Sequence, residues 1–173
     1  MNYIESEDLD FSPLFTSDRF TSYYIEKSEL YERIGSKTVS SVEFIVIEKE
    51  NFYFIEAKSS FPYSKVEDVK VAEQKIYDKL HHSIDLFASK KLGLKKFVTG
   101  DLAKELGSTA VFEKDLANCD LYFYLVMHRK FREDWIENVQ IMLNDKLKPL
   151  RKIWNIEVKV VTESQARDLK FIQ

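Results

Sequence analysis

The sequence has little cysteine, glycine or proline, and each shortage excludes a class of protein. A single cysteine, Cys119, excludes a disulfide framework within the chain and is typical of a reducing compartment. Only 4 glycines and 3 prolines among 173 residues, with 45% hydrophobic residues, argue against a disordered or fibrous chain. The length favours one domain, spanning residues 1–173, that buries a substantial core.

The sequence also lacks long apolar runs and the common ligand-binding loops. No apolar run approaches the roughly 20 residues of a transmembrane helix, and the N-terminus is acidic, unlike a signal peptide. The glycines at 100 and 107 indicate turns and not a phosphate loop. Cys119 has no partner at zinc-ligand spacing, and the adjacent His81 and His82 point about 100° apart on a helix, so we interpret them as surface histidines. We expect a cytoplasmic protein without membrane contact.

The stretch from 40 to 60 predicts a β-hairpin, on which the rest of the analysis depends. Residues 42–47 and 52–58 are rich in β-branched and aromatic side chains, and the polar residues 48–51 separate them. If Ile47 faces Phe52 across the turn, Glu43 faces Glu56, and Lys58 shares their face. Both faces also carry apolar residues, which predicts a strand pair covered on both sides. The face opposite the two acids is expected to carry Val42, Phe44, Val46, Tyr53, Ile55 and Ala57.

Two carboxylates on one covered face need a compensating charge. Like charges opposite each other on a sheet repel, and an unpaired buried carboxylate costs several kcal/mol. Lys58 can neutralise one acid, but a divalent cation explains two, since hard cations such as Mg²⁺ bind carboxylate and carbonyl oxygens. The pattern therefore favours a metal site.

The segment Glu43, twelve residues, then Glu56-Ala57-Lys58 resembles the PD-(D/E)XK nuclease superfamily. The family usually has Pro-Asp at the first acid, where this chain has Val42-Glu43. The resemblance implies an α+β (mixed α/β), restriction endonuclease-like fold, with a central mixed sheet, a hairpin carrying the acidic site, and flanking helices. It also implies that Glu43, Glu56 and the Ala57 carbonyl hold Mg²⁺ or Mn²⁺. Lys58 is then the residue that orients and activates the attacking water.

Two auxiliary residues follow from the same resemblance. A glutamate on the helix before the hairpin often joins the metal site, and Glu32 or Glu29 fits that place, although Glu29 also suits a solvated first helical turn. One branch of the superfamily has Gln-x-x-x-Tyr on the helix after the hairpin. In this chain that spacing falls on Glu73 and Tyr77, and we expect Gln74 to be the auxiliary residue.

Basic residues are clustered despite a net charge of −3, which is unfavourable for a nucleic-acid binder. The first group, Lys90, Lys91, Lys95 and Lys96, is our candidate nucleic-acid-binding surface. The alternative interpretation is ordinary solvated helix ends. A second group comprises Lys146, Lys148, Arg151 and Lys152.

The remaining pattern predicts a core over about 26–128 and a C-terminal helix-strand-helix extension over about 131–173. Residues 1–18 have no periodicity and are expected to be irregular, and 20–25 is a short strand or the approach to a helix. We predict helices over 28–35, 65–91, 101–106, 132–152 and 163–172, and strands over 96–98, 121–127 and 156–161.

Two functions are compatible with these residues. The first is a Mg²⁺-dependent endonuclease or exonuclease that hydrolyses phosphodiester bonds of nucleic acid, with DNA as the expected substrate and a homodimer if both strands of a duplex are cut. The second is a catalytically inactive nuclease-like fold that acts as a nucleic-acid- or protein-binding module. A third interpretation, a solvated Glu56–Lys58 pair on an exposed sheet, conflicts with the apolar neighbours Ile45 and Phe54.

Overall fold

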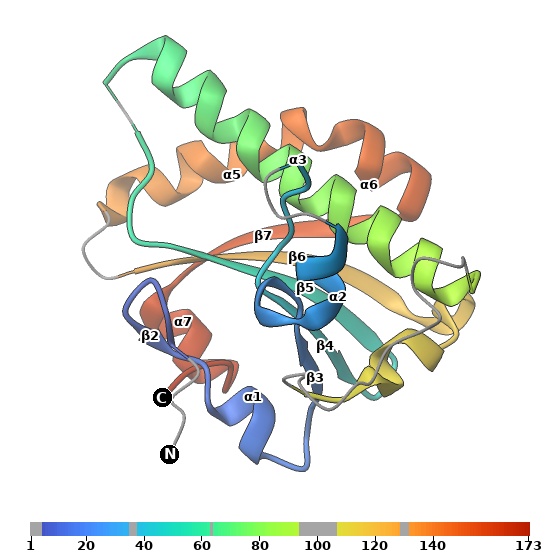
Figure 1. Cartoon of the computed structure of the whole chain (residues 1–173). Coiled ribbons are helices and arrows are strands. Elements are labelled where there is room, and N and C mark those ends of the chain that lie inside the picture. Colours follow the sequence, from blue (N-terminus) through green and yellow to red (C-terminus); the bar gives the residue numbers. More distant parts are fainter. Residues whose placement is uncertain (1–4, 35–37, 63, 94–106, 129–131) are drawn as a thin grey trace.

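A five-stranded mixed sheet forms the centre of the computed structural model, which describes residues 5–34, 38–62, 64–93, 107–128 and 132–173 (Figure 1). The first three strands are antiparallel to one another in sequence order, and the last two run parallel to the third. Helices flank this sheet, which confirms the predicted mixed α+β class. In spatial order the strands are β3 (Thr21–Tyr24), β4 (Phe44–Glu48), β5 (Asn51–Lys58), β6 (Asp120–Met127) and β7 (Ile156–Thr162).

The register of β4 and β5 is the predicted one. Ile47 pairs with Phe52, and the ladder ends where Phe44 pairs with Ile55, so Glu43 lies just before the strand. One residue departs from the prediction: Val42 packs on the face opposite Phe44, although strict alternation places both on one face. The chain is not part of the ladder before Phe44, and the Val42 amide instead donates to Ser83 Oγ at 2.8 Å.

Three helices cover one face of the sheet (Figure 1). The long helix α3 (Val66–Lys91) joins β5 to β6, and a crossover of this kind makes the two strands parallel. Helices α5 (Ile136–Lys146) and α6 (Lys148–Trp154) lie beside it. The helix predicted over 65–91 is present, and apolar residues at steps of three and four along it are buried in the core: Ile76, Leu80, Ile84 and Phe87.

The other face is covered by segments from the two ends of the described chain (Figure 1). The N-terminal part forms a small hairpin, β1 (Glu5–Ser6) with β2 (Leu9–Asp10), and helix α1 (Pro13–Thr16). The prediction of an irregular 1–18 was therefore wrong over these residues, because strands of two residues are too short for periodicity to reveal. Helix α7 (Glu163–Asp168) covers the same face and is shorter than predicted. The core here is largely aromatic and includes Phe11, Phe44, Tyr53, Tyr124 and Phe171.

The helices predicted over 28–35 and 132–152 can be compared with the observed helix ends. The helix predicted over 28–35 is α2 (Glu29–Ile34), and the side chain of Ser28 accepts the Tyr31 amide at 3.1 Å before it. The predicted helix over 132–152 is divided at Leu147, because Pro149 has no amide hydrogen to continue the ladder. The predicted strand 96–98 and helix 101–106 lie outside the described residues. Short 3₁₀ segments complete the order: η1 (Ile25–Lys27), η3 (Thr109–Glu113), η4 (Leu116–Asn118) and η5 (Glu133–Trp135).

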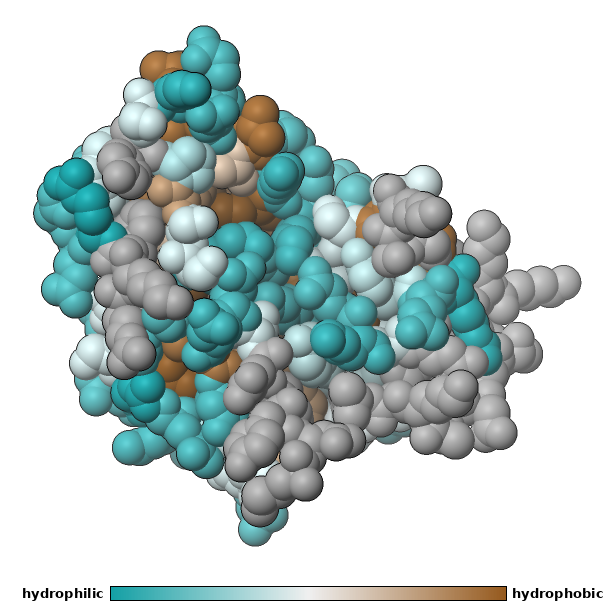
Figure 2. Space-filling view, turned by 60° about the vertical axis from the view of Figure 1, so that its left-hand side comes forward, coloured by the Kyte–Doolittle hydropathy of each residue, from teal (hydrophilic) through white to brown (hydrophobic). Residues whose placement is uncertain are grey.

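The surface shown in Figure 2 is mainly hydrophilic, with hydrophobic residues in separate small patches. Within the described ranges, no helix combines the length and the apolar character needed to cross a bilayer.

Replacing a side chain at the centre of the sheet should test the packing. Phe123 in β6 is fully buried, so Phe123→Ala should lower the free energy of unfolding by about 3–5 kcal/mol through lost burial and a residual cavity. Urea unfolding followed by circular dichroism measures this change. The matched control is Ile153→Ala, at a side chain that is 74% exposed, and its effect should stay within about 0.5 kcal/mol. Equal losses in the two variants would contradict the described core.

Candidate functional site

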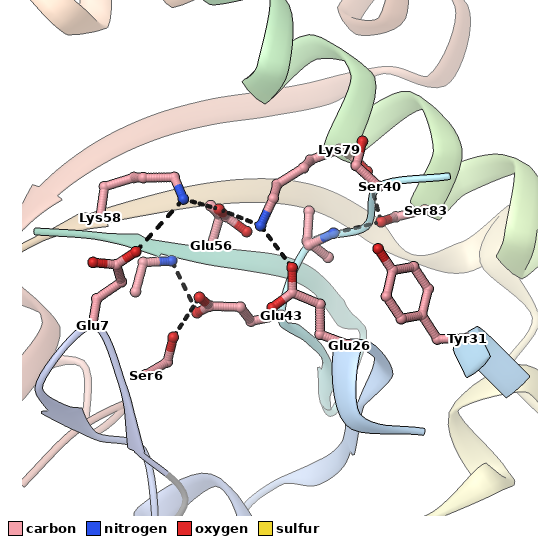
Figure 3. A network of polar contacts seen from close by, with 12 residues as sticks. Ser6, Glu7, Glu26, Tyr31, Ser40, Glu43, Glu56, Lys58, Lys79 and Ser83 are labelled. Carbon is pink, nitrogen blue, oxygen red and sulfur yellow. Dashed lines mark hydrogen bonds and ion pairs between the residues drawn. The ribbon is translucent and has the colours of Figure 1, made fainter. Parts of the chain in front are cut away.

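Glu43, Glu56 and Lys58 lie together at the C-terminal end of β5 (Figure 3). Glu56 and Lys58 belong to the strand, and Glu43 immediately precedes the neighbouring β4. The two carboxylates are withdrawn from solvent, since Glu43 is 3% exposed and Glu56 is fully buried. The structure thus brings together the three residues that the sequence pattern singled out.

Glu56 is paired with two lysines, one from its own strand and one from α3. Its Oε1 lies 2.8 Å from Lys58 Nζ and 2.8 Å from Lys79 Nζ. Both carboxylate oxygens are buried, and neither has a contact of full hydrogen-bond geometry among the residues that the structure describes. Burial raises the pKa of Glu56, and the charges of Lys79 and Lys58 oppose that rise. The carboxylate therefore retains acceptor capacity for a further cation.

Lys79, which the sequence analysis did not single out, is the second cation of the site. It projects from α3 and also lies 2.8 Å from Glu26 Oε1 in η1 (Figure 3). Burial alone would lower the pKa of Lys79, but the carboxylates of Glu56 and Glu26 outweigh it and raise that pKa. Ser83, one turn later on the apolar side of α3, is fully buried. A serine at that position is the sequence signal that this part of α3 faces polar groups.

Glu43 is held by neutral donors. Its Oε2 accepts the Ala57 amide at 3.1 Å, and its Oε1 accepts a hydrogen bond from the Ser6 hydroxyl. Burial and the nearby charge of Glu56 raise the pKa of Glu43 to about 8, against the Ser6 hydrogen bond and Lys79. Near neutral pH this carboxyl can therefore hold or release a proton.

The oxygens of Glu43, Glu56 and Ala57 could hold a divalent cation. In an extended strand the N–H and C=O of one residue point to the same edge. Because the Ala57 amide faces Glu43, its carbonyl faces that side too. No group of three His, Cys, Asp or Glu side chains suited to a metal occurs in the described ranges. The donor set is two carboxylates and one carbonyl, a composition that Mg²⁺ accepts when water completes its shell.

A cavity of about 630 Å³ opens onto the site between β5 and α3. Its wall includes Lys58, Lys79 and Glu7, while the carboxylates of Glu43 and Glu56 lie beneath the surface. Lys58 is 27% exposed and is therefore the member of the predicted set that a molecule in the cavity would meet first.

The two predicted auxiliary residues lie elsewhere. Gln74 is exposed on α3, where its amide bonds to Asp78 at 2.7 Å and to Lys146 at 2.7 Å. Glu32 is exposed on α2. From the same two regions, Lys79 of α3 lies beside Glu56, and Glu26 of η1 lies beside Lys79.

The candidate nucleic-acid-binding lysines are described only in part. Lys95 and Lys96 lie outside the described residues. Lys90 and Lys91 end α3, about 17–18 Å along the helix axis from Lys79 at 1.5 Å per residue. The Lys91 ammonium donates to the Lys114 carbonyl at 2.7 Å.

A larger cavity of about 770 Å³ lies at the N-terminal ends of β6 and β7. The paired carboxylates lie at the other end of the sheet. This cavity contains three residues of the second basic group, but three acids balance their charge, so it presents no net charge to a ligand. These six residues are Lys148, Arg151, Lys152, Asp120, Asp145 and Glu157.

Comparison with known proteins gives no relative: no family model, curated protein or solved structure matches this chain.

The raised pKa of Glu43 should make stability depend on pH. Between pH 4.5 and about 8 the folded protein binds more protons at this carboxyl than the unfolded chain does. Its contribution to stability is therefore complete below pH 4.5 and is lost as the pH rises through 8. The free energy of unfolding, measured in urea with EDTA from pH 5 to pH 9, should fall by on the order of a few kcal/mol.

Glu43→Gln should flatten this profile, because its neutral amide can still accept the Ala57 N–H. Glu113→Gln, an exposed glutamate in η3, is the control and should leave the profile as in the wild type. A Glu43→Gln profile as steep as that of the wild type would show that Glu43 titrates normally.

Removing Lys79 should destabilise the protein through Glu56. Lys79→Met leaves one cation for a buried carboxylate and should cost about 3–5 kcal/mol of unfolding free energy. Neutralising the acid as well, in Glu56→Gln/Lys79→Met, should recover part of that loss. Lys75→Met, at an exposed lysine of the same helix, should change stability by less than about 0.5 kcal/mol. Additive effects of the two substitutions would mean that the pair is not coupled.

Proposed function

We propose that the protein is a metal-dependent nuclease that hydrolyses phosphodiester bonds of nucleic acid, with DNA as the expected substrate. One observation carries the proposal: two buried carboxylates and the Lys58 ammonium converge under a cavity of about 630 Å³. The order of antiparallel β3-β4-β5, crossover helix α3 and parallel β6 supports it. It agrees with the order of elements that the resemblance to PD-(D/E)XK nucleases implies.

The donor chemistry fits Mg²⁺ or Mn²⁺. Glu56 Oε2 is a buried acceptor without a hydrogen-bond partner in the described part of the chain. Glu43 is a carboxyl whose proton is released near neutral pH, and added positive charge would favour that release. Glu43, Glu56 and the Ala57 carbonyl would hold the ion. When bound, it would lower the pKa of a water molecule and balance charge on the phosphoryl oxygens.

Two lysines of the chain would supply positive charge and hold the reacting groups in position. Lys58, held at 2.8 Å by Glu56 and partly exposed to the cavity, would orient the attacking water and meet a phosphoryl oxygen. Lys79 neutralises Glu56 from the other side and fixes its carboxylate. Lys79 therefore acts as a positioning residue.

A second candidate is a nuclease-like module that binds nucleic acid or a protein without cleaving. The observation that favours it is the pairing of Glu56 with two lysines, which balances its charge without a metal. On this account Glu43 is a buried acid kept neutral by its raised pKa.

Cleavage of supercoiled plasmid and of a single-stranded DNA oligonucleotide, with Mg²⁺, Mn²⁺ or EDTA, separates the two candidates. We expect metal-dependent cutting by the wild type and a loss of at least about 100-fold in Lys58→Ala. The matched control is Lys49→Asn, which removes a lysine charge at the far end of the same strand pair. Asparagine tolerates the positive φ of 56° at that position. Absence of cutting by folded wild type on both substrates would leave the binding module as the function.

A further inference from the structure

The tip of the β1–β2 hairpin lies on the candidate site (Figure 3). Glu7, in the turn between the two strands, places Oε1 3.8 Å from Lys58 Nζ, and its Oε2 accepts the Ser59 amide at 3.2 Å. The preceding Ser6 donates its hydroxyl to Glu43. Glu7 also belongs to the wall of the 630 Å³ cavity. One turn thus contacts both the acid and the lysine of the site.

An ammonium and a backbone N–H that converge on one carboxylate form a general anion cradle. Phosphoryl oxygens are bound by the same donors, since both anions accept charge-assisted hydrogen bonds. We propose that Lys58 Nζ and the Ser59 N–H form a subsite for a phosphoryl group, and that the Glu7 carboxylate is an internal competitor for it. The inference rests on the proposed function for the source of that group, which would be the nucleic-acid backbone.

The contacts of the hairpin tip are of a kind that another anion can replace. Glu7 and Lys58 are 33% and 27% exposed, so water and salt weaken their attraction. Glu7 and Asp8 both have left-handed backbones, with φ of 50° and 66°, in a turn that favours Asn and Gly. The base of the hairpin is held more firmly, because Leu9 is buried and the Gln173 amide donates to the Asp10 carbonyl at 3.0 Å. A phosphoryl group can therefore displace the tip while the base stays in place.

Removing the Glu7 charge should strengthen phosphate binding at this subsite. The probe is inorganic phosphate, titrated at constant ionic strength while the Ser59 amide is followed by ¹⁵N–¹H NMR. In Glu7→Asn, which tolerates the left-handed backbone but is too short to keep both contacts, half-saturation should come at a phosphate concentration at least about fivefold lower than in the wild type. That factor corresponds to a subsite that Glu7 occupies most of the time.

Asp8→Asn is the matched control, because it removes the same charge from the next residue of the turn and leaves Glu7 in place. It should titrate like the wild type. Adding Lys58→Ala to Glu7→Asn should abolish the saturable response of Ser59.

Two results would overturn the proposal: no response of the Ser59 amide in Glu7→Asn, or an equal gain in Asp8→Asn. The plasmid assay, run on the same variants, separates this inference from the proposed nuclease. Cleavage without a Ser59 response would reject the subsite and keep the nuclease. A Ser59 response without cleavage by any variant would keep the subsite and reject the nuclease.

Discussion

A buried carboxylate is costly unless cations pair with it, and the fully buried Glu56 has two. Lys58 comes from the same strand, whereas Lys79 comes from the helix that covers the sheet. The electrostatic requirement of one side chain therefore ties β5 to α3. Because Lys79 also contacts Glu26, the ion cluster extends to η1, the segment that follows β3. One ion cluster thus links the site to the helix, whose apolar side chains also pack on the sheet.

Opposite charges alternate along this cluster. Glu7, Lys58, Glu56, Lys79 and Glu26 follow one another, and each carboxylate has an ammonium beside it. Glu43 differs, because it accepts hydrogen bonds from a backbone amide and a hydroxyl. The two acids of the site are therefore unlike in chemistry. Burial raises the pKa of Glu56 against the charges of two lysines, while Glu43 can change its protonation near pH 8.

The parts of the structure with strong periodicity were predictable from the sequence. The hairpin register, the long helix after it and the buried strand β6 follow from alternation or from 3.6-residue spacing, and Glu43, Glu56 and Lys58 were found through them. Lys79 was not, because α3 carries several lysines and their spacing alone does not say which one faces a carboxylate. Ser6 and Glu7 were missed for a different reason. Their strands have two residues each, and their turn lacks the Asn-Gly signal of a tight hairpin.

The mixed direction of the strands has a consequence for folding. The β4–β5 pair closes over a two-residue turn, whereas pairing of β5 with β6 must wait until α3 and the segment after it have been spanned. Short loops close at a lower entropic cost, so the β4–β5 hairpin should form early. At that stage Glu43 and Glu56 are neighbours before the lysine of α3 has arrived. Lys58 is the cation that the hairpin itself supplies beside Glu56, and docking of α3 should add Lys79 as the second.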